Sequence, residues 1–288
     1  MIWLYICLCV FVIGVFFYMN FNHIVLSSYI IRNEKLPKEF HNYRIVHLSD
    51  LHLKEFGKNN TKLIQKIDKV TPDVIFVTGD MVYKRKISFD VVYQLMQKLV
   101  NKYPVYYIWG NHESALKEKI KQQLQEKLEA LGVKVLIDEQ TNISRGNKNI
   151  NLYGIDFNFK LEPKNVEAIT DERYRKAFKK QIKPLDQSQY NILLAHDPLN
   201  YELYDETGFD LVFSGHVHGG ALRVFGKAIF SPRRLLFPKY SSGVYQGKNG
   251  CLVVSRGLGN STIKFRMFNF PQIVCVTLKI DKIEESRC

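Results

Sequence analysis

Two histidines separated by one residue lie in the segment Gly215-His216-Val217-His218-Gly219-Gly220, directly after the largely apolar run 209–214. Alternate side chains of an extended segment point the same way, so His216 and His218 can face one cavity together. Neutral imidazole is the commonest protein ligand for a metal ion. The alternative is an ordinary loop whose histidines only make hydrogen bonds, so this pair is informative only together with the rest of the chain.

Four further apolar runs end in residues of the same chemical kind, namely Asp50 and His52, Asp80, Asn111 and His112, and His196. Each motif alone is weak, because Gly-Asp occurs in many turns and a lone histidine is usually structural. Besides His112, the set holds four imidazoles, two carboxylates and one amide oxygen. That is too many ligands for one tetrahedral metal and fits two metals that share a bridge. Mixed nitrogen and oxygen ligands without thiolate favour Mn²⁺, Fe or Zn²⁺ over Mg²⁺.

The elements that must position these residues are short strands alternating with amphipathic helices, which indicates an α/β protein. We expect the five ligand-bearing strands within 44–52, 72–80, 103–109, 189–195 and 209–214, and helices at 58–70, 89–99, 115–131 and 171–182. Further strands are expected at 133–137, 149–155, 252–255 and 273–280. Neighbouring parallel strands bring their carboxyl ends into one crevice, so the motifs are predicted to converge.

The net charge and the cysteine content narrow the classes of function but do not identify one. The 288 residues carry 41 basic and 28 acidic side chains, a formal charge of +13, which predicts an anionic partner such as a phosphate-bearing substrate, anionic lipid or nucleic acid. The five cysteines have no metal-site spacing, so neither a thiolate site nor a disulfide framework is predicted.

The N-terminal run 2–19 is apolar and precedes any charged side chain. Its length suffices to cross a membrane, so we expect a single-pass anchor at residues 1–31, a linker at 32–42 and a globular domain at 43–288. A cleaved signal peptide is the rival interpretation, but no basic residue precedes the run and no cleavage motif follows it. The basic residues Arg32, Lys35, Lys38 and Arg44 after the run favour a cytoplasmic domain, and an exported orientation stays open.

Asp50-x-His52, Gly79-Asp80, Gly110-Asn111-His112-Glu113, His196 and Gly215-His216-x-His218 together resemble the signature of the calcineurin-like metallophosphoesterases, over about residues 43–280 and in the family's order. With the N-terminal run, the chain is most similar to the membrane-associated bacterial branch. The resemblance implies a four-layer αββα sandwich of two mixed sheets.

The resemblance also implies roles for these residues. Asp50, His52 and His218 would bind one divalent metal, Asn111, His196 and His216 would bind a second, and Asp80 would bridge them. A bridging hydroxide would then attack the phosphorus atom, and His112 would donate a proton to the leaving oxygen. Many relatives carry an acid where this chain has Tyr83, so the group that orients His112 is not predicted. Glu113, Gly219 and Arg223 are further candidates for substrate binding.

Three functions remain open at this point. The first is a hydrolase of phosphoester or pyrophosphate bonds, acting on a lipid-linked or cell-envelope phosphate. The second is a nuclease or cyclic-nucleotide phosphodiesterase, and the third is a tethered binding protein without turnover. The basic helix 171–182 is either a solvated face or a surface for anionic lipid, and segment 230–238 either docks a lipid or packs on the core. Binding to nucleic acid is not favoured, and the sequence does not predict the oligomeric state.

Overall fold

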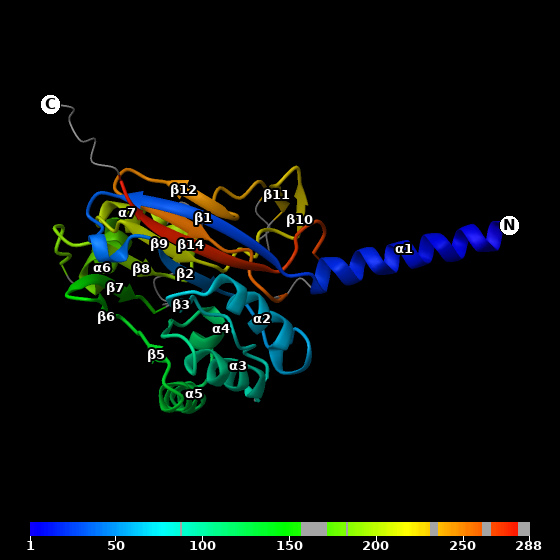
Figure 1. The fold of residues 1–288 in the computed structure, drawn as a ribbon, viewed down its shortest axis with the longest axis horizontal. Helices are drawn as coiled ribbons and strands as arrows, with labels where there is room; N and C mark the ends of the chain where they lie inside the picture. The colour runs from blue at the N-terminus through cyan, green and yellow to red at the C-terminus, as the bar shows by residue number, and fades with distance from the viewer. Residues whose placement is uncertain (87, 157–171, 183, 231–235, 261–265, 282–288) are drawn as a thin grey trace.

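The computed structural model describes residues 1–86, 88–156, 172–182, 184–230, 236–260 and 266–281. In this part of the chain, two six-stranded sheets lie face to face (Figure 1). The first has the order β1 (Val25–Asn33), β14 (Gln272–Ile280), β2 (Tyr43–Leu48), β3 (Val74–Val77), β4 (Val105–Tyr107) and β5 (Lys134–Val135). The second has the order β12 (Gly243–Gln246), β13 (Cys251–Val254), β9 (Leu211–Ser214), β8 (Asn191–Leu194), β7 (Lys148–Gly154) and β6 (Glu139–Arg145).

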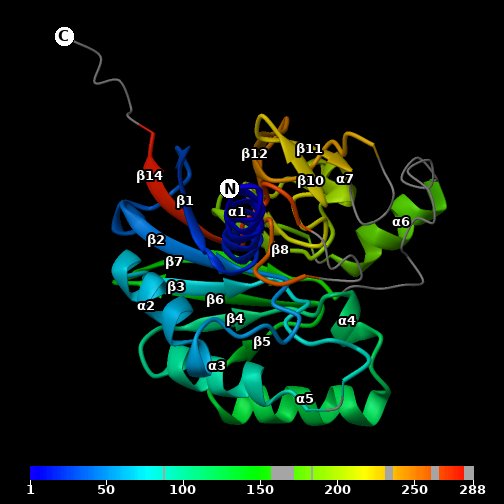
Figure 2. The ribbon, with the colours of Figure 1, turned by 90° about the vertical axis from the view of Figure 1, so that its right-hand side faces the viewer.

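Helices cover the outer face of each sheet (Figure 2). The first sheet is covered by α2 (Thr61–Val70), α3 (Asp90–Val100) and α5 (Glu118–Ala130), and the second by α6 (Glu172–Gln181) and α7 (Tyr201–Glu206). Short turns of helix lie at α4 (Asn111–Ser114), Lys38–Phe40, Lys58–Asn60 and Pro198–Asn200. Each covering helix is amphipathic; α2, for example, buries Leu63 and Ile67 on one face.

A continuous apolar core joins the inner faces of the sheets. The ring of Phe76 on β3 meets the ring of Phe213 on β9 edge to face, with centroids 5.3 Å apart. The layers therefore run helices, sheet, sheet, helices. This confirms the predicted four-layer αββα sandwich of mixed sheets.

The strand directions decide where the site lies. In the first sheet β2, β3 and β4 are parallel, and in the second β7, β8, β9 and β13 are parallel. The predicted site residues follow the carboxyl ends of β2, β3, β4, β8 and β9 within a few residues. Because these ends lie along one edge of the two stacked sheets, the motifs meet as the sequence predicts.

The N-terminal boundaries differ from the predicted ones. The helix α1 (Ile2–Asn22) is the one described helix long and apolar enough to cross a membrane, with a mean hydropathy of 2.5. It projects from one side of the molecule (Figure 1), and two residues connect it to β1, which pairs in parallel with β14 from Val25 to Asn33. Residues 25–33 thus belong to the domain and not to the anchor.

The segment predicted as a linker at 32–42 is also part of the domain. Leu36 and Phe40 are buried in the core between the sheets. The strand β1 that precedes it is an edge strand that mixes polar and apolar residues, and its partner β14 lies far away in the sequence, so no local pattern identifies it.

Candidate dinuclear metal centre

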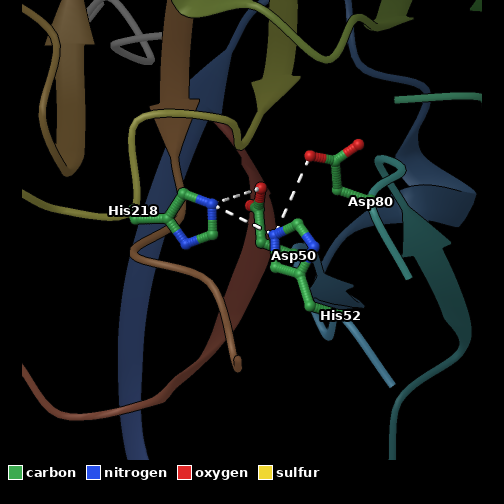
Figure 3. A group of neighbouring side chains, drawn as sticks. All are labelled: Asp50, His52, Asp80 and His218. Carbon is green, nitrogen blue, oxygen red and sulfur yellow. Dashed lines mark hydrogen bonds and ion pairs between the residues drawn. The ribbon is translucent and has the colours of Figure 1, made fainter. Parts of the chain in front are cut away.

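One group of ligand-type atoms comes from three loops (Figure 3). The Nε2 atoms of His52 and His218 face each other at 3.2 Å. Asp50 Oδ1 lies 3.4 Å from His218 Nε2, and Asp80 Oδ2 lies 3.8 Å from His52 Nε2. All four side chains are nearly or fully buried and present one ligand atom each within 4.8 Å of one another. The group could hold one metal ion.

A second group lies on the other side of Asp80. His216 Nδ1 is 3.1 Å from His196 Nε2 and 2.9 Å from Asn111 Oδ1. His196 Nε2 is 3.2 Å from the same amide oxygen and 3.4 Å from Asp80 Oδ2. These four residues are the second set that the motifs predict to converge, and they could hold a second ion.

Asp80 connects the two groups through a single oxygen atom. Its Oδ2 atom is the one near both His52 and His196. Its Oδ1 atom accepts a hydrogen bond of 2.7 Å from the backbone N–H of His112. The carboxylate is therefore fixed in rotation, and one oxygen is left to serve both groups.

The protonation states of the histidines in the two groups are those expected of a site for metal cations. The Nδ1 atom of His196 lies 2.6 Å from the Thr78 carbonyl oxygen, which can only accept, so Nδ1 carries a hydrogen and Nε2 is the atom that faces the cluster. Burial lowers the pKa of His52 to about 4 and that of His218 well below its usual value, so both rings are neutral. A cation between these nitrogen and oxygen atoms would accept their converging lone pairs.

The two carboxylates point to the same conclusion. Burial raises the pKa of Asp50, and the nearby carboxylate of Asp80 raises it further. Burial would also raise the pKa of Asp80, but the imidazoles of His196 and His52 outweigh it and lower this pKa. Burial likewise opposes a charge on His196, yet Asp80 raises its pKa to about 10. A proton on His196 thus occupies a place that a cation can take, and the donor set fits two divalent ions.

Five of the cluster residues have a backbone conformation that side chains rarely adopt. Asp50, His52, Asp80, His216 and His218 have φ between 49° and 68°. For residues other than glycine this left-handed region costs on the order of 1–2 kcal/mol each. The surrounding structure holds these angles, and they turn successive polar side chains toward one place just after each strand.

His112 is held by backbone and by ring contacts. Its Nδ1 atom accepts a hydrogen bond of 3.2 Å from the backbone N–H of Lys84. Its ring lies 5.0 Å from the Tyr83 ring and 4.6 Å from the His52 ring, between centroids. This chain therefore places the aromatic ring of Tyr83 against His112 and a backbone donor on Nδ1. The neutral ring consequently carries its hydrogen on Nε2.

The side chain of Glu113, a predicted candidate for substrate binding, is bonded to backbone groups. It is fully buried, and its carboxylate accepts hydrogen bonds from the backbone N–H groups of Asp80, Met81, Val82 and Gly110 and from the Tyr107 hydroxyl. Both oxygens are used in this way. Glu113 therefore ties the loop of Asp80 to the turn that carries Asn111, and its hydrogen bonds hold both in place.

Arg223 and Gly219 also differ from the predicted substrate contacts. The buried guanidinium of Arg223 donates to the carbonyl oxygens of Gly219, at 2.7 Å, and of Gly226. Gly219 has φ +67°, and a Cβ there would lie 2.6 Å from Arg256 Cγ. Both residues shape the loop that follows His218, because the guanidinium of Arg223 joins the carbonyl groups of Gly219 and Gly226 within it.

Sequence reasoning missed Arg266 and Asn269. Arg266 is 2 % exposed and donates to the carbonyl oxygens of His218, Gly257 and Gly259, among others. Asn269 donates to the His218 carbonyl at 2.7 Å. Neither residue belongs to a strand-end motif and both lie about 50 residues beyond His218, so no local signal could have identified them.

Several known proteins have sequences similar to this one. The chain is 28% identical over 271 residues to a metallophosphoesterase of Aquifex aeolicus, covering 93% of this chain and 96% of that protein. It is 27% identical over 188 residues to a phosphodiesterase of Escherichia coli, with 63% of each chain covered. It is 24% identical over 281 residues to a UDP-2,3-diacylglucosamine pyrophosphatase of Chlamydia muridarum, covering 83% and 85%.

The sequence profile of the calcineurin-like phosphoesterases matches residues 43–220, which contain all the residues of both groups and His112. These residues span more than half of the chain. The chain therefore belongs to the calcineurin-like phosphoesterase family and is a phosphoric ester hydrolase.

Proposed function

We propose that this protein is a membrane-anchored hydrolase of disubstituted phosphates, with a lipid-linked pyrophosphate or phosphodiester as its substrate class. Asp50, His52 and His218 hold one divalent ion, Asn111, His196 and His216 hold the other, and Asp80 serves both. The observation that carries the proposal is the position of Asp80 Oδ2, which lies between the two groups while Oδ1 is bonded elsewhere.

Two bound ions supply electrostatic stabilisation of the phosphoryl oxygens and lower the pKa of a water molecule. The protein's own contribution is to fix the ligands and to present His112. Because Lys84 N–H occupies Nδ1, the neutral ring offers its Nε2 hydrogen to an oxygen of the substrate. Such a hydrogen bond strengthens as charge develops on that oxygen in the transition state.

The choice of a disubstituted phosphate has two supports. Two relatives are named as a phosphodiesterase and as a pyrophosphatase of a diacylated, UDP-linked sugar. The apolar α1 places the domain beside a bilayer if it spans the membrane, which favours a lipid-linked substrate. The proposal places the domain in the cytoplasm, since the basic residues Arg32, Lys35 and Lys38 follow α1.

The test uses the full-length protein in detergent, reconstituted separately with Mn²⁺, Fe²⁺ or Zn²⁺. Turnover of bis-p-nitrophenyl phosphate is compared with that of p-nitrophenyl phosphate, and bound metal is measured by mass spectrometry. We expect two ions per chain and a preference for the diester. Turnover of neither substrate with both ions bound would instead support a tethered binding protein.

His112→Ala separates the roles within the site. We expect it to lower turnover about 100-fold or more while leaving the metal content unchanged. Loss of metal in this variant would make His112 a ligand. Cleavage of the domain by protease added from outside, in intact cells or in spheroplasts with a sealed inner membrane, would overturn the cytoplasmic orientation.

A further inference from the structure

A group of exposed apolar side chains lies on the same side of the domain as α1. The exposed fractions are 101% for Phe225, 68% for Leu236 and for Phe237, 53% for Phe268 and 40% for Val224. We call these five residues the apolar rim. Single exposed apolar residues are common on soluble proteins, but several large ones together mark a contact surface.

The rim residues come from adjoining segments of chain. β10 (Leu222–Val224) and β11 (Lys227–Phe230) form a hairpin with Phe225 and Gly226 at its tip. On one side Phe237 N–H donates to the Ile229 carbonyl of β11, and on the other Arg223 N–H donates to the Met267 carbonyl beside Phe268. The segments that carry the rim are therefore hydrogen-bonded neighbours, and β10 and β11 lie on the side of the domain from which α1 projects (Figures 1 and 2).

The rim reaches α1 itself. The Phe268 ring lies 5.2 Å from the Phe16 ring of α1, between centroids, and its backbone N–H donates to Asn20 Oδ1 at 2.8 Å. Phe16 lies six residues before the helix end at Asn22, which is about 9 Å along the axis at ~1.5 Å per residue. Phe268 thus lies level with the apolar part of α1 and not beyond its end.

From this depth we propose that the apolar rim inserts into the bilayer interface beside α1, with Phe225 as the deepest residue of the hairpin. The occupant is the lipid surface, because the apolar window of α1, which contacts the rim at Phe268, has a mean hydropathy of 2.5 and is 0% buried within the domain. A depth of about 9 Å matches the ~5–10 Å to which interfacial elements bury their apolar faces. The inference rests on the proposed membrane anchoring.

Hydrogen bonds join the segments that carry the rim to the loop of His218 in the metal centre. Asn269 and Arg266, which flank Phe268, both donate to the His218 carbonyl, at 2.7 Å and 3.3 Å. Arg223 of β10 donates to the Gly219 carbonyl. An inserted rim therefore holds the His218 loop at the level of lipid headgroups, where a lipid-linked phosphate can reach both metal groups without leaving the membrane. The rim thus makes the enzyme act on substrates that lie in the bilayer.

The prediction for segment 230–238 is partly addressed by this arrangement. Residues 231–235 lie outside the described residues, whereas Leu236 and Phe237 are exposed and belong to the rim.

The test measures the depth of a tryptophan in the full-length protein, reconstituted into vesicles of phosphatidylethanolamine and phosphatidylglycerol with or without acyl-chain bromine. Phe225→Trp and Phe237→Trp report on the rim. Gln123→Trp is the control, because this exposed residue lies on α5, away from α1 (Figure 1). The emission of the wild type, from Trp3 and Trp109, is subtracted.

We expect bromine to quench the added emission at residues 225 and 237 by about half or more, as for an interfacial residue, and to leave residue 123 unquenched. No quenching at either rim position would show that the rim stays in water and overturns the inference. Equal quenching at all three positions would also overturn it, since the contact is then not specific to the rim. A blue shift at residue 225 without quenching would mean that a second protein surface covers the rim.

Turnover of bis-p-nitrophenyl phosphate by the same vesicles separates the two proposals. If turnover is at the wild-type level but the tryptophan at the rim is not quenched, the proposed insertion is wrong and the proposed hydrolase activity still stands. A quenched rim without turnover, after metal reconstitution, counts against the proposed activity alone. Phe225 is fully exposed, so replacing it removes no packing within the domain.

Discussion

Glu113→Gln is the substitution that best tests how the metal centre is built. The carboxylate accepts five hydrogen bonds, from four backbone N–H groups and from the Tyr107 hydroxyl. Oε2 accepts from Asp80 and Gly110, and Oε1 accepts the other three. Glutamine keeps one acceptor oxygen and turns an NH₂ group toward backbone donors, so at least two bonds are lost.

Each lost bond to a charged acceptor is worth about 1.5–3 kcal/mol, so the two together give about 3–6 kcal/mol. The carboxylate also repels the nearby Asp80, and burial raises the pKa of Glu113, so part of this loss is offset. We therefore expect a loss near the lower end, about 3 kcal/mol of unfolding free energy. For a domain of this size that lowers Tm by on the order of 10 °C.

The assay is urea unfolding of the full-length protein in detergent, followed by the emission of the buried Trp109. Glu118→Gln is the matched control, because its exposed carboxylate forms only a surface pair with Lys121 and its loss changes stability by less than about 1 kcal/mol. Metal content is measured in parallel. Wild-type stability with both ions bound would refute the positioning role. Wild-type stability and metal content with lost turnover would restore Glu113 as a substrate contact.

Three further predictions concern the ligands. Asp80→Asn keeps the shape of the side chain but removes the charge shared by both groups, so we expect bound metal to fall from two ions toward none by mass spectrometry. Gly215→Ala places a Cβ 1.9 Å from Ser49 Oγ and 2.4 Å from Asp50 Oδ2, so it should displace Asp50 and lower both stability and metal content; normal values for both would contradict the packing. Chelation with EDTA should abolish turnover and lower unfolding free energy by about 3–4 kcal/mol, both restored by Mn²⁺ or Zn²⁺.

The sequence predicted which ligand-type side chains converge, because each follows the end of a short apolar strand. His216 and His218 illustrate this, since a local pattern of strand, glycine and histidine identifies them without knowledge of the fold. The helices of the first sheet were predicted for a similar reason, because periods of 3.6 residues are local. The prediction failed for β1, where polar and apolar residues mix and the pairing partner is β14, at the other end of the chain.

The roles of Arg223 and Glu113 show the other limit. An arginine or a glutamate near a motif has the chemistry to bind substrate, and only the tertiary structure decides whether its charge faces solvent or backbone. Here both side chains are buried and bonded to backbone groups. The carbonyl partners of Arg266 and Asn269 could not be predicted either, because contacts across some 50 residues depend on how the loops fold together.

The chain by itself determined which residues can ligate metal and that they follow parallel strands, because side-chain chemistry and strand periodicity are local properties. Tertiary structure alone decided that one oxygen of Asp80 faces both groups and that backbone donors fix Glu113 and His112. It also decided that the strand after α1 pairs with β14. These features depend on distances between segments remote in sequence, and such distances are set only when the two sheets pack.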